Sequence, residues 1–171
     1  MKLRLLFAIS LLSGIGACVA APSDNLPEQP SPIQETDLAY AVGDWSGTLS
    51  YLDYSSGKEV VLPLELGISQ AGPCLQISFV YPNEPNANST GERCLSADGL
   101  EFDGKPVSRS ANIGIGTEFI LEYEGEDNGQ PAYKRESYSL SETSVIIETA
   151  FRRPEETNMT VRNKIDVKPA D

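Results

Sequence analysis

The sequence predicts an all-β protein, an antiparallel up-and-down barrel of about 8–10 strands, with a two-sheet β-sandwich as the alternative. Three observations favour this class: apolar and polar residues alternate with a period of two, turn dipeptides separate the alternating segments, and no helical apolar stripe follows residue 43. Such alternation is typical of strands with one buried face and one wet face. The spacing indicates successive hairpins without a long Greek-key return, and closure into a barrel hides the strand edges.

The predicted elements follow one another along the chain. We expect one or two helical turns in residues 35–42, immediately before the first strand. Period-two alternation then marks residues 45–53, 59–68, 74–81, 117–124, 144–153 and 159–167. Hairpin-type turn pairs stand at Ser56-Gly57, Asp98-Gly99, Asp103-Gly104 and Asn128-Gly129.

The N-terminus has the form of an export signal. Lys2 and Arg4 precede an apolar run that is shorter than the about 20 residues a membrane-spanning helix needs. Residues 19–37 contain four prolines and few apolar residues, which is typical of an extended spacer. We therefore expect a signal peptide in residues 1–17, a tether in 18–40 and one barrel domain in 41–171.

The end of the signal resembles the lipobox of bacterial lipoproteins, in the residues Ile15-Gly16-Ala17-Cys18. This resemblance implies that Cys18 becomes the first mature residue and carries a lipid that holds the protein on a membrane. Val19 stands where an aspartate would imply retention in the inner membrane, so the resemblance implies the outer membrane of the cell envelope. Cleavage after Ala20 or Ala21 is the alternative, and it would give a periplasmic or secreted protein.

The cysteine count supports this interpretation. The chain has three cysteines, so lipidation of Cys18 leaves Cys74 and Cys94 as one pair in an oxidising compartment. We predict a disulfide between them, which would stabilise the fold by about 3 kcal/mol in the chain-entropy model. Two buried free thiols are the alternative. No metal site is expected, because two thiolates without histidine make an incomplete zinc shell.

Charge and composition exclude several function classes. The formal net charge of -12 argues against nucleic acid, whose phosphates need a basic patch. The chain contains no histidine, which removes Ser–His and Cys–His nucleophile pairs, His-ligated zinc and His-ligated haem. We expect no catalytic residues and no cofactor, since nothing fixes a carboxylate pair even if Glu65 or Glu148 faces the interior. A solvated acidic face, rather than a cation site, is predicted for Glu118, Glu122, Glu124, Glu126 and Asp127.

The start of the first strand resembles the Gly-x-Trp signature of lipocalins and related calycin barrels, in Gly43-Asp44-Trp45. The resemblance implies that Trp45 plugs one end of the barrel and that an arginine from a late strand packs over it. The available arginines are Arg152, Arg153 and Arg162. The second family motif, a Thr-Asp-Tyr turn, has no match, because Leu52-Asp53-Tyr54 is similar in letters but belongs to a different hairpin.

These observations lead to two functional hypotheses. The first is a non-enzymatic, lipid-anchored envelope protein whose lipocalin-like barrel binds a small apolar ligand in its mouth. The expected lining residues are Phe79, Tyr81, Phe119, Leu121 and Tyr123. A barrel filled by its own side chains would leave no room for such a ligand. The second hypothesis is a protein-binding module whose acidic surface captures a basic partner by electrostatic steering.

Overall fold

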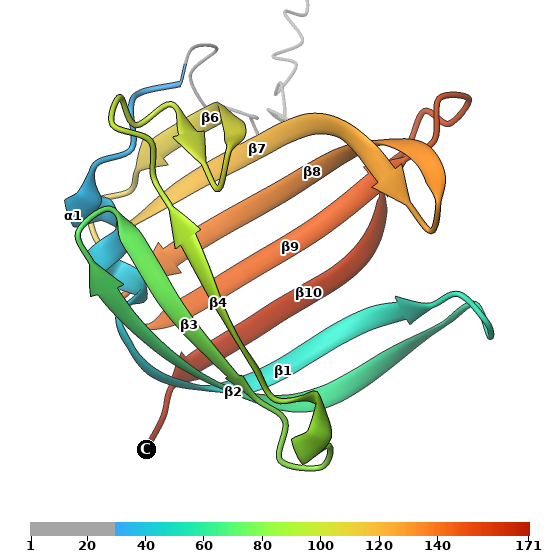
Figure 1. Ribbon diagram of the computed structural model, residues 1–171, viewed down its shortest axis with the longest axis horizontal. Coiled ribbons are helices and arrows are strands. Elements are labelled where there is room, and N and C mark those ends of the chain that lie inside the picture. Colours follow the sequence, from blue (N-terminus) through green and yellow to red (C-terminus); the bar gives the residue numbers. More distant parts are fainter. Residues whose placement is uncertain (1–29) are drawn as a thin grey trace, which may run out of the picture.

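The computed structural model describes residues 30–171, which form one antiparallel sheet of ten strands rolled into a nearly closed barrel (Figure 1). This confirms the predicted all-β class and the antiparallel up-and-down barrel. The strands are β1 (Gly43–Asp53), β2 (Lys58–Ala71), β3 (Cys74–Val80), β4 (Ser89–Cys94), β5 (Glu101–Phe102), β6 (Lys105–Asn112), β7 (Gly116–Asp127), β8 (Gln130–Ser141), β9 (Ser144–Arg152) and β10 (Thr160–Pro169). The short helices are α1 (Glu35–Leu38), η1 (Ala39–Ala41) and η2 (Pro85–Ala87).

Strand order follows the chain except at one junction. The order in the sheet is β4-β3-β2-β1-β10-β9-β8-β7-β6-β5, so the first strand pairs with the last. In that pairing Gly47 lies opposite Val167, and a Cβ atom at position 47 would come within 2.2 Å of the Asp166 carbonyl oxygen. Glycine at position 47 therefore allows the close approach of β1 and β10.

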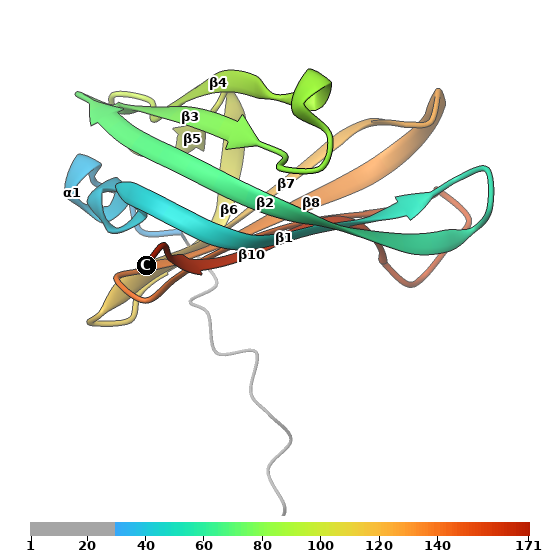
Figure 2. The same cartoon turned by 90° about the horizontal axis from the view of Figure 1, so that it is seen from below.

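The barrel has two different ends. One end, here called the helical end, carries α1 and η1 beside the start of β1 (Figure 1). The opposite end, the hairpin end, carries the β1–β2 turn, the β7–β8 turn and the loop between β9 and β10. Figure 2 shows β3 and β4 in a layer over β7, β8 and β10, and the interior lies between these two layers. The helical end and the hairpin end are therefore the two ends of one interior.

The two edges of the sheet meet only near the helical end. The edge strands β4 and β5 are joined by a single bridge between Leu95 and Phe102. The Asp103 amide donates to the Cys94 carbonyl at 2.8 Å, and the Ser96 amide donates to the Glu101 carbonyl at 2.9 Å. Within residues 30–171, β4 pairs with β3 alone along the rest of its length. We call this unpaired line between β4 and β6 the seam.

The segment before β1 belongs to the folded domain. As expected, residues 35–41 form helical turns, and Leu38 and the preceding Ile33 are fully buried. The Ile33 amide donates to the Gly99 carbonyl at 3.0 Å, and the positive φ of 72° at Gly99 suits glycine. The domain therefore begins before residue 33, and the predicted boundary at residue 41 is wrong. The predicted signal peptide in residues 1–17, Cys18 and the first part of the tether lie outside the described residues.

The largest fully buried side chains form one apolar cluster inside the barrel. Full burial of a large apolar side chain contributes about 1.5–3 kcal/mol, so this cluster supplies much of the driving force for folding. Its largest fully buried members are Leu38, Leu64, Phe102, Phe119, Leu121, Leu140, Val145 and Val167. Among residues 30–171, no helix has the length and apolarity needed to cross a bilayer.

Candidate functional site

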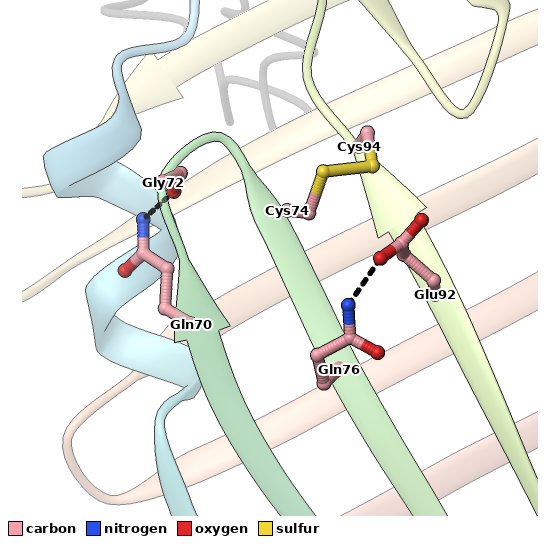
Figure 3. Close-up of a disulfide and its surroundings, with 6 residues drawn as sticks. All are labelled: Gln70, Gly72, Cys74, Gln76, Glu92 and Cys94. Carbon is pink, nitrogen blue, oxygen red and sulfur yellow. Dashed lines mark hydrogen bonds between the residues drawn. A yellow bond between two sulfur atoms is a disulfide. The ribbon is translucent and has the colours of Figure 1, made fainter.

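A disulfide joins the edge strand to the rest of the sheet at the helical end (Figure 3). Cys74 of β3 and Cys94 of β4 lie directly opposite each other, and their sulfur atoms are bonded. This confirms the predicted pairing. The Glu92 carboxylate lies beside the two sulfur atoms and accepts a hydrogen bond from Gln76. Because both sulfurs are used in the disulfide, this group does not offer thiolates to a metal.

Between the fully buried core and the hairpin end, the inward face carries half-buried apolar side chains, while Phe151 and Ala132, still nearer the hairpin end, are buried again. The half-buried residues pack on the core from five different strands, yet each keeps some exposure. We call them the mouth set: Leu49, Phe79, Tyr81, Tyr123, Ile147 and Ile165. Their strand positions share one face with the buried core residues, as the register pairs Leu49 with Leu62 and Ile165, and Phe79 with Leu66. The mouth set is therefore an apolar wall on the inward face that solvent still reaches.

The predicted lining residues divide into two groups. Phe79, Tyr81 and Tyr123 belong to the mouth set. Phe119 and Leu121 are 0% exposed, so neighbouring residues cover their side chains. Phe119 instead stacks on Tyr138, with ring centroids 4.5 Å apart. The expectation that Phe119 and Leu121 line a ligand space is therefore wrong, because neighbouring side chains fill that part of the barrel.

Behind the seam, a buried carboxylate gathers polar groups from three strands. Glu136 of β8 is 6% exposed, and its carboxylate accepts hydrogen bonds from the Tyr123 hydroxyl at 2.5 Å, the Tyr138 hydroxyl at 2.8 Å and Lys105 Nζ at 2.9 Å. Arg93 of β4 reaches across the seam to Asp103 at 2.7 Å. Of these contacts, the Arg93–Asp103 ion pair joins the two edges of the sheet, beside the backbone hydrogen bond from the Asp103 amide to the Cys94 carbonyl.

The charges in this network shift one another's ionisation. Burial alone would raise the pKa of Glu136, but hydrogen bonds from Tyr123, Lys105 and Tyr138 outweigh burial and lower this pKa below 4.5. Burial, together with the nearby Glu136 carboxylate, raises the pKa of both Tyr123 and Tyr138. Glu136 is therefore held ionised and both tyrosines are held protonated, which is a stable and fully paired arrangement.

A second buried carboxylate lies at the hairpin end. Asp127, the last residue of β7, is 6% exposed and accepts a hydrogen bond from the Tyr54 hydroxyl. Burial and this hydrogen bond raise the pKa of Tyr54 to about 12. The guanidinium groups of Arg153 and Arg162 lie 4.0 Å and 3.9 Å from the Asp127 carboxylate. Asp127 was predicted to lie on a solvated acidic face, but its strand position instead directs it inward.

The predicted arginine partner of Trp45 is also wrong. Trp45 is buried at the helical end, where its indole Nε1 donates to the Ala41 carbonyl at 2.9 Å. It lies opposite Pro169 in β10, whereas Arg162 is near the other end of that strand, about 20 Å away at ~3.3 Å per residue. Arg152 lies over the Tyr133 ring, and Arg153 lies near Asp127. The η1 turn, not an arginine, covers the tryptophan.

The remaining predicted carboxylates face outward. Glu65 is exposed on β2, and Glu148 of β9 pairs in register with Ser137 and Lys164 on the outer face. On β7, Glu118 and Glu122 also lie on the outer face, where Glu122 forms an ion pair with Arg135 at 2.7 Å. Among residues 30–171 the buried carboxylates are therefore Asp127 and Glu136, and neither was predicted to face the interior.

Together these features define a ten-stranded antiparallel barrel that is packed at one end and has a half-buried apolar wall towards the other. The solved structures include one with a similar fold, the crystal structure of Rv2717c from M. tuberculosis, at a TM-score of 0.54. The two chains share 11% identity, and the match covers 82% of this chain and 100% of that chain. At this identity the likeness concerns the fold alone. No family model and no curated protein matches the sequence.

Proposed function

We propose that this protein is a membrane-anchored, non-enzymatic barrel that binds a small apolar ligand against the mouth set. The observation that carries the proposal is the mouth set itself, whose apolar side chains pack on the fully buried core and keep part of their surface exposed. Covering apolar surface that solvent still reaches lowers the free energy of the complex, by about 25 cal/mol per Å² of apolar surface buried. Sites for small molecules in proteins are usually lined by apolar side chains with a few polar groups among them.

A neutral fluorescent lipophile, N-phenyl-1-naphthylamine, tests this proposal. We expect saturable binding by the folded protein, and we expect Leu49→Trp to weaken it by about tenfold because the larger ring occupies the ligand space. Val61→Trp is the matched control, since Val61 lies on the adjacent strand but faces solvent with 56% exposure. Equal affinity of both variants, or no saturable binding by the parent protein, would contradict the proposal.

The second hypothesis, capture of a basic partner, has weaker support from the surface charges. The outer face of β7 is acidic, but Arg135 neutralises Glu122 and Ser139 donates a hydrogen bond to Glu118. The nearby Asp166 carboxylate is paired with Lys164 at 3.1 Å. Electrostatic steering needs a large acidic patch without neighbouring cations. On the outer face of the sheet, Arg135 and Lys164 interrupt the acidic residues.

We further propose that Cys18 carries a lipid that holds the barrel on the outer membrane. The support is the signal-like N-terminus, which ends in the sequence Ile15-Gly16-Ala17-Cys18, followed by a proline-rich spacer. Mass spectrometry of the mature N-terminus should show a lipid-modified Cys18, and Cys18→Ser should release the protein from the membrane fraction. A free N-terminus at Ala21 or Pro22 would instead indicate a periplasmic or secreted protein.

A further inference from the structure

Two arginines at the hairpin end lie near a buried carboxylate without a hydrogen bond to it. Arg153 and Arg162 lie at 4.0 Å and 3.9 Å from Asp127, beyond hydrogen-bonding distance, while the Tyr54 hydroxyl occupies the carboxylate. Arg162 also donates to the Leu52 carbonyl and lies 4.3 Å from the centroid of the Tyr54 ring. Two guanidinium groups therefore share one buried carboxylate that neither of them binds directly.

These groups share a face with the mouth set. Asp127 and Tyr123 lie on the same face of β7, because they are separated by an even number of residues. Arg153 follows Phe151, an inward residue of β9, and lies 5.8 Å from the centroid of its ring. On β8, Lys134 pairs with Phe151 and lies 5.8 Å from the centroid of the Tyr123 ring. The apolar wall is thus bordered at the hairpin end by Arg153, Arg162, Lys134 and the Asp127 carboxylate. Two further carboxylates at this end have other partners, because Asp53 accepts from the Ser55 and Ser56 hydroxyls and Glu156 accepts from the Arg153 amide.

The network behind the seam differs in how its charges are paired. There Lys105 pairs with Glu136, and Arg93 pairs with Asp103, so its charges are balanced. At the hairpin end, the guanidinium groups keep donors that no side-chain carboxylate among residues 30–171 accepts within hydrogen-bonding distance. Arginines without a hydrogen-bonded carboxylate are unexpected in a chain whose net charge is -12. Arginine binds carboxylate and phosphate groups through paired donors, and apolar walls strengthen this attraction by lowering the local dielectric constant.

We propose that the ligand is an anionic amphiphile, with an apolar chain against the mouth set and a carboxylate or phosphate head group at Arg153, Arg162 and Lys134. This inference rests on the proposed function and adds the charge of the ligand and its orientation. The head group lies at the hairpin end, and the chain extends towards the packed helical end. Here the positively charged residues are binding residues, and Asp127 with Tyr54 holds the two arginines in position.

The experiment compares two probes that share one fluorescent chain, cis-parinaric acid and its methyl ester. The acid should bind the parent protein about tenfold more tightly than the ester, because only the acid forms charge-assisted hydrogen bonds. The preference should shrink as ionic strength rises, because salt screens attraction between charges near the surface. Displacement of the acid probe by dodecanoate or by dodecyl phosphate would then distinguish a carboxylate from a phosphate head group.

Matched variants identify the residues responsible. The double variant Arg153→Gln/Arg162→Gln should lose the preference for the acid and keep its affinity for the ester. Arg152→Gln should change neither affinity, because Arg152 lies over the Tyr133 ring on the outer face. If the double variant fails to fold in a thermal melt, Arg153→Lys/Arg162→Lys and Lys134→Gln are measured instead, and the lysine variant should retain part of the preference.

The outcomes separate this inference from the proposed function. Equal binding of the acid and the ester by the parent protein would overturn the inference while leaving an apolar site in place. A parallel loss of both affinities in the double variant would also overturn it, since the arginines would then act only on the shape of the barrel. Absence of saturable binding by either probe would overturn the proposed function and the inference together.

Discussion

Replacing Trp45 with alanine is expected to lower the free energy of unfolding by about 3–5 kcal/mol, the usual range for loss of a buried aromatic residue. The indole is 4% exposed and fills the helical end of the barrel beneath η1. Its removal also leaves the Ala41 carbonyl without its indole donor. In a domain of this size each kcal/mol moves the melting temperature by about 2–4 °C, so a thermal melt will resolve the loss.

Two controls make this result specific. Val61→Ala removes exposed apolar atoms from β2 and should leave the melting temperature nearly unchanged. Trp45→Phe keeps most of the apolar volume but loses the hydrogen bond to Ala41, so it should fall between the parent protein and Trp45→Ala. Emission from Trp45, the only tryptophan, should be blue-shifted and poorly quenched by acrylamide. Red-shifted, freely quenched emission from folded protein would contradict the burial of Trp45.

Glu136→Ala is the second substitution with a large expected effect. It leaves Lys105 without its buried partner and removes the acceptor of the Tyr123 and Tyr138 hydroxyls. Breaking one side of a buried, hydrogen-bonded ion pair costs about 3–5 kcal/mol, which should appear as a lower urea midpoint. Glu122→Ala is the matched control, because Glu122 pairs with Arg135 on the outer face, where an ion pair contributes about 0–1 kcal/mol. Similar losses in both variants would contradict a special role for Glu136.

The same residue gives stability a defined dependence on pH. The pKa of Glu136 is lower in the folded protein than its ordinary value of 4.5, so the folded state binds this proton less readily than the unfolded state. Its contribution is therefore fully present above about pH 5 and is lost as pH falls through the lowered folded pKa. Glu136→Gln should reduce the acid-side slope of melting temperature against pH, and an unchanged slope would assign the acid sensitivity to other carboxylates.

Strands with purely apolar inward faces could be predicted from the sequence, whereas strands with mixed faces could not. In β2 the alternation of Leu64, Leu66 and Ile68 with polar residues is plain, and all three are buried as expected. In β8 the inward positions include Lys134 and Glu136, so the period of two does not appear as an apolar pattern. The charged network thus hides the strand that carries it, and no local signal indicates that Tyr123, Tyr138 and Lys105 converge on Glu136.

The candidate site could be predicted only in part from the sequence. Phe79, Tyr81 and Tyr123 were identified because alternation assigns a face, and faces are local properties of a strand. Which inward residues stay half-exposed depends on packing between strands that are distant in the chain. The position of Arg153 and Arg162 was inferred from a family resemblance, and strand direction places them at the opposite end from Trp45. The charged residues that border the mouth set could be placed only from the strand register.

Pairing of the first strand with the last has a consequence for how the molecule is made. β1 has only one of its two partners until β10, at the far end of the domain, has been synthesised. A nascent chain can form the β1–β4 meander early, but β1 keeps an unpaired edge throughout elongation, and such edges invite pairing with other chains. Contacts of this sequence separation also slow folding, to the range of milliseconds to seconds. Completion of the barrel is therefore tied to the synthesis of β10, which gives any chaperone or translocation machinery a defined interval in which the polypeptide is still unfolded.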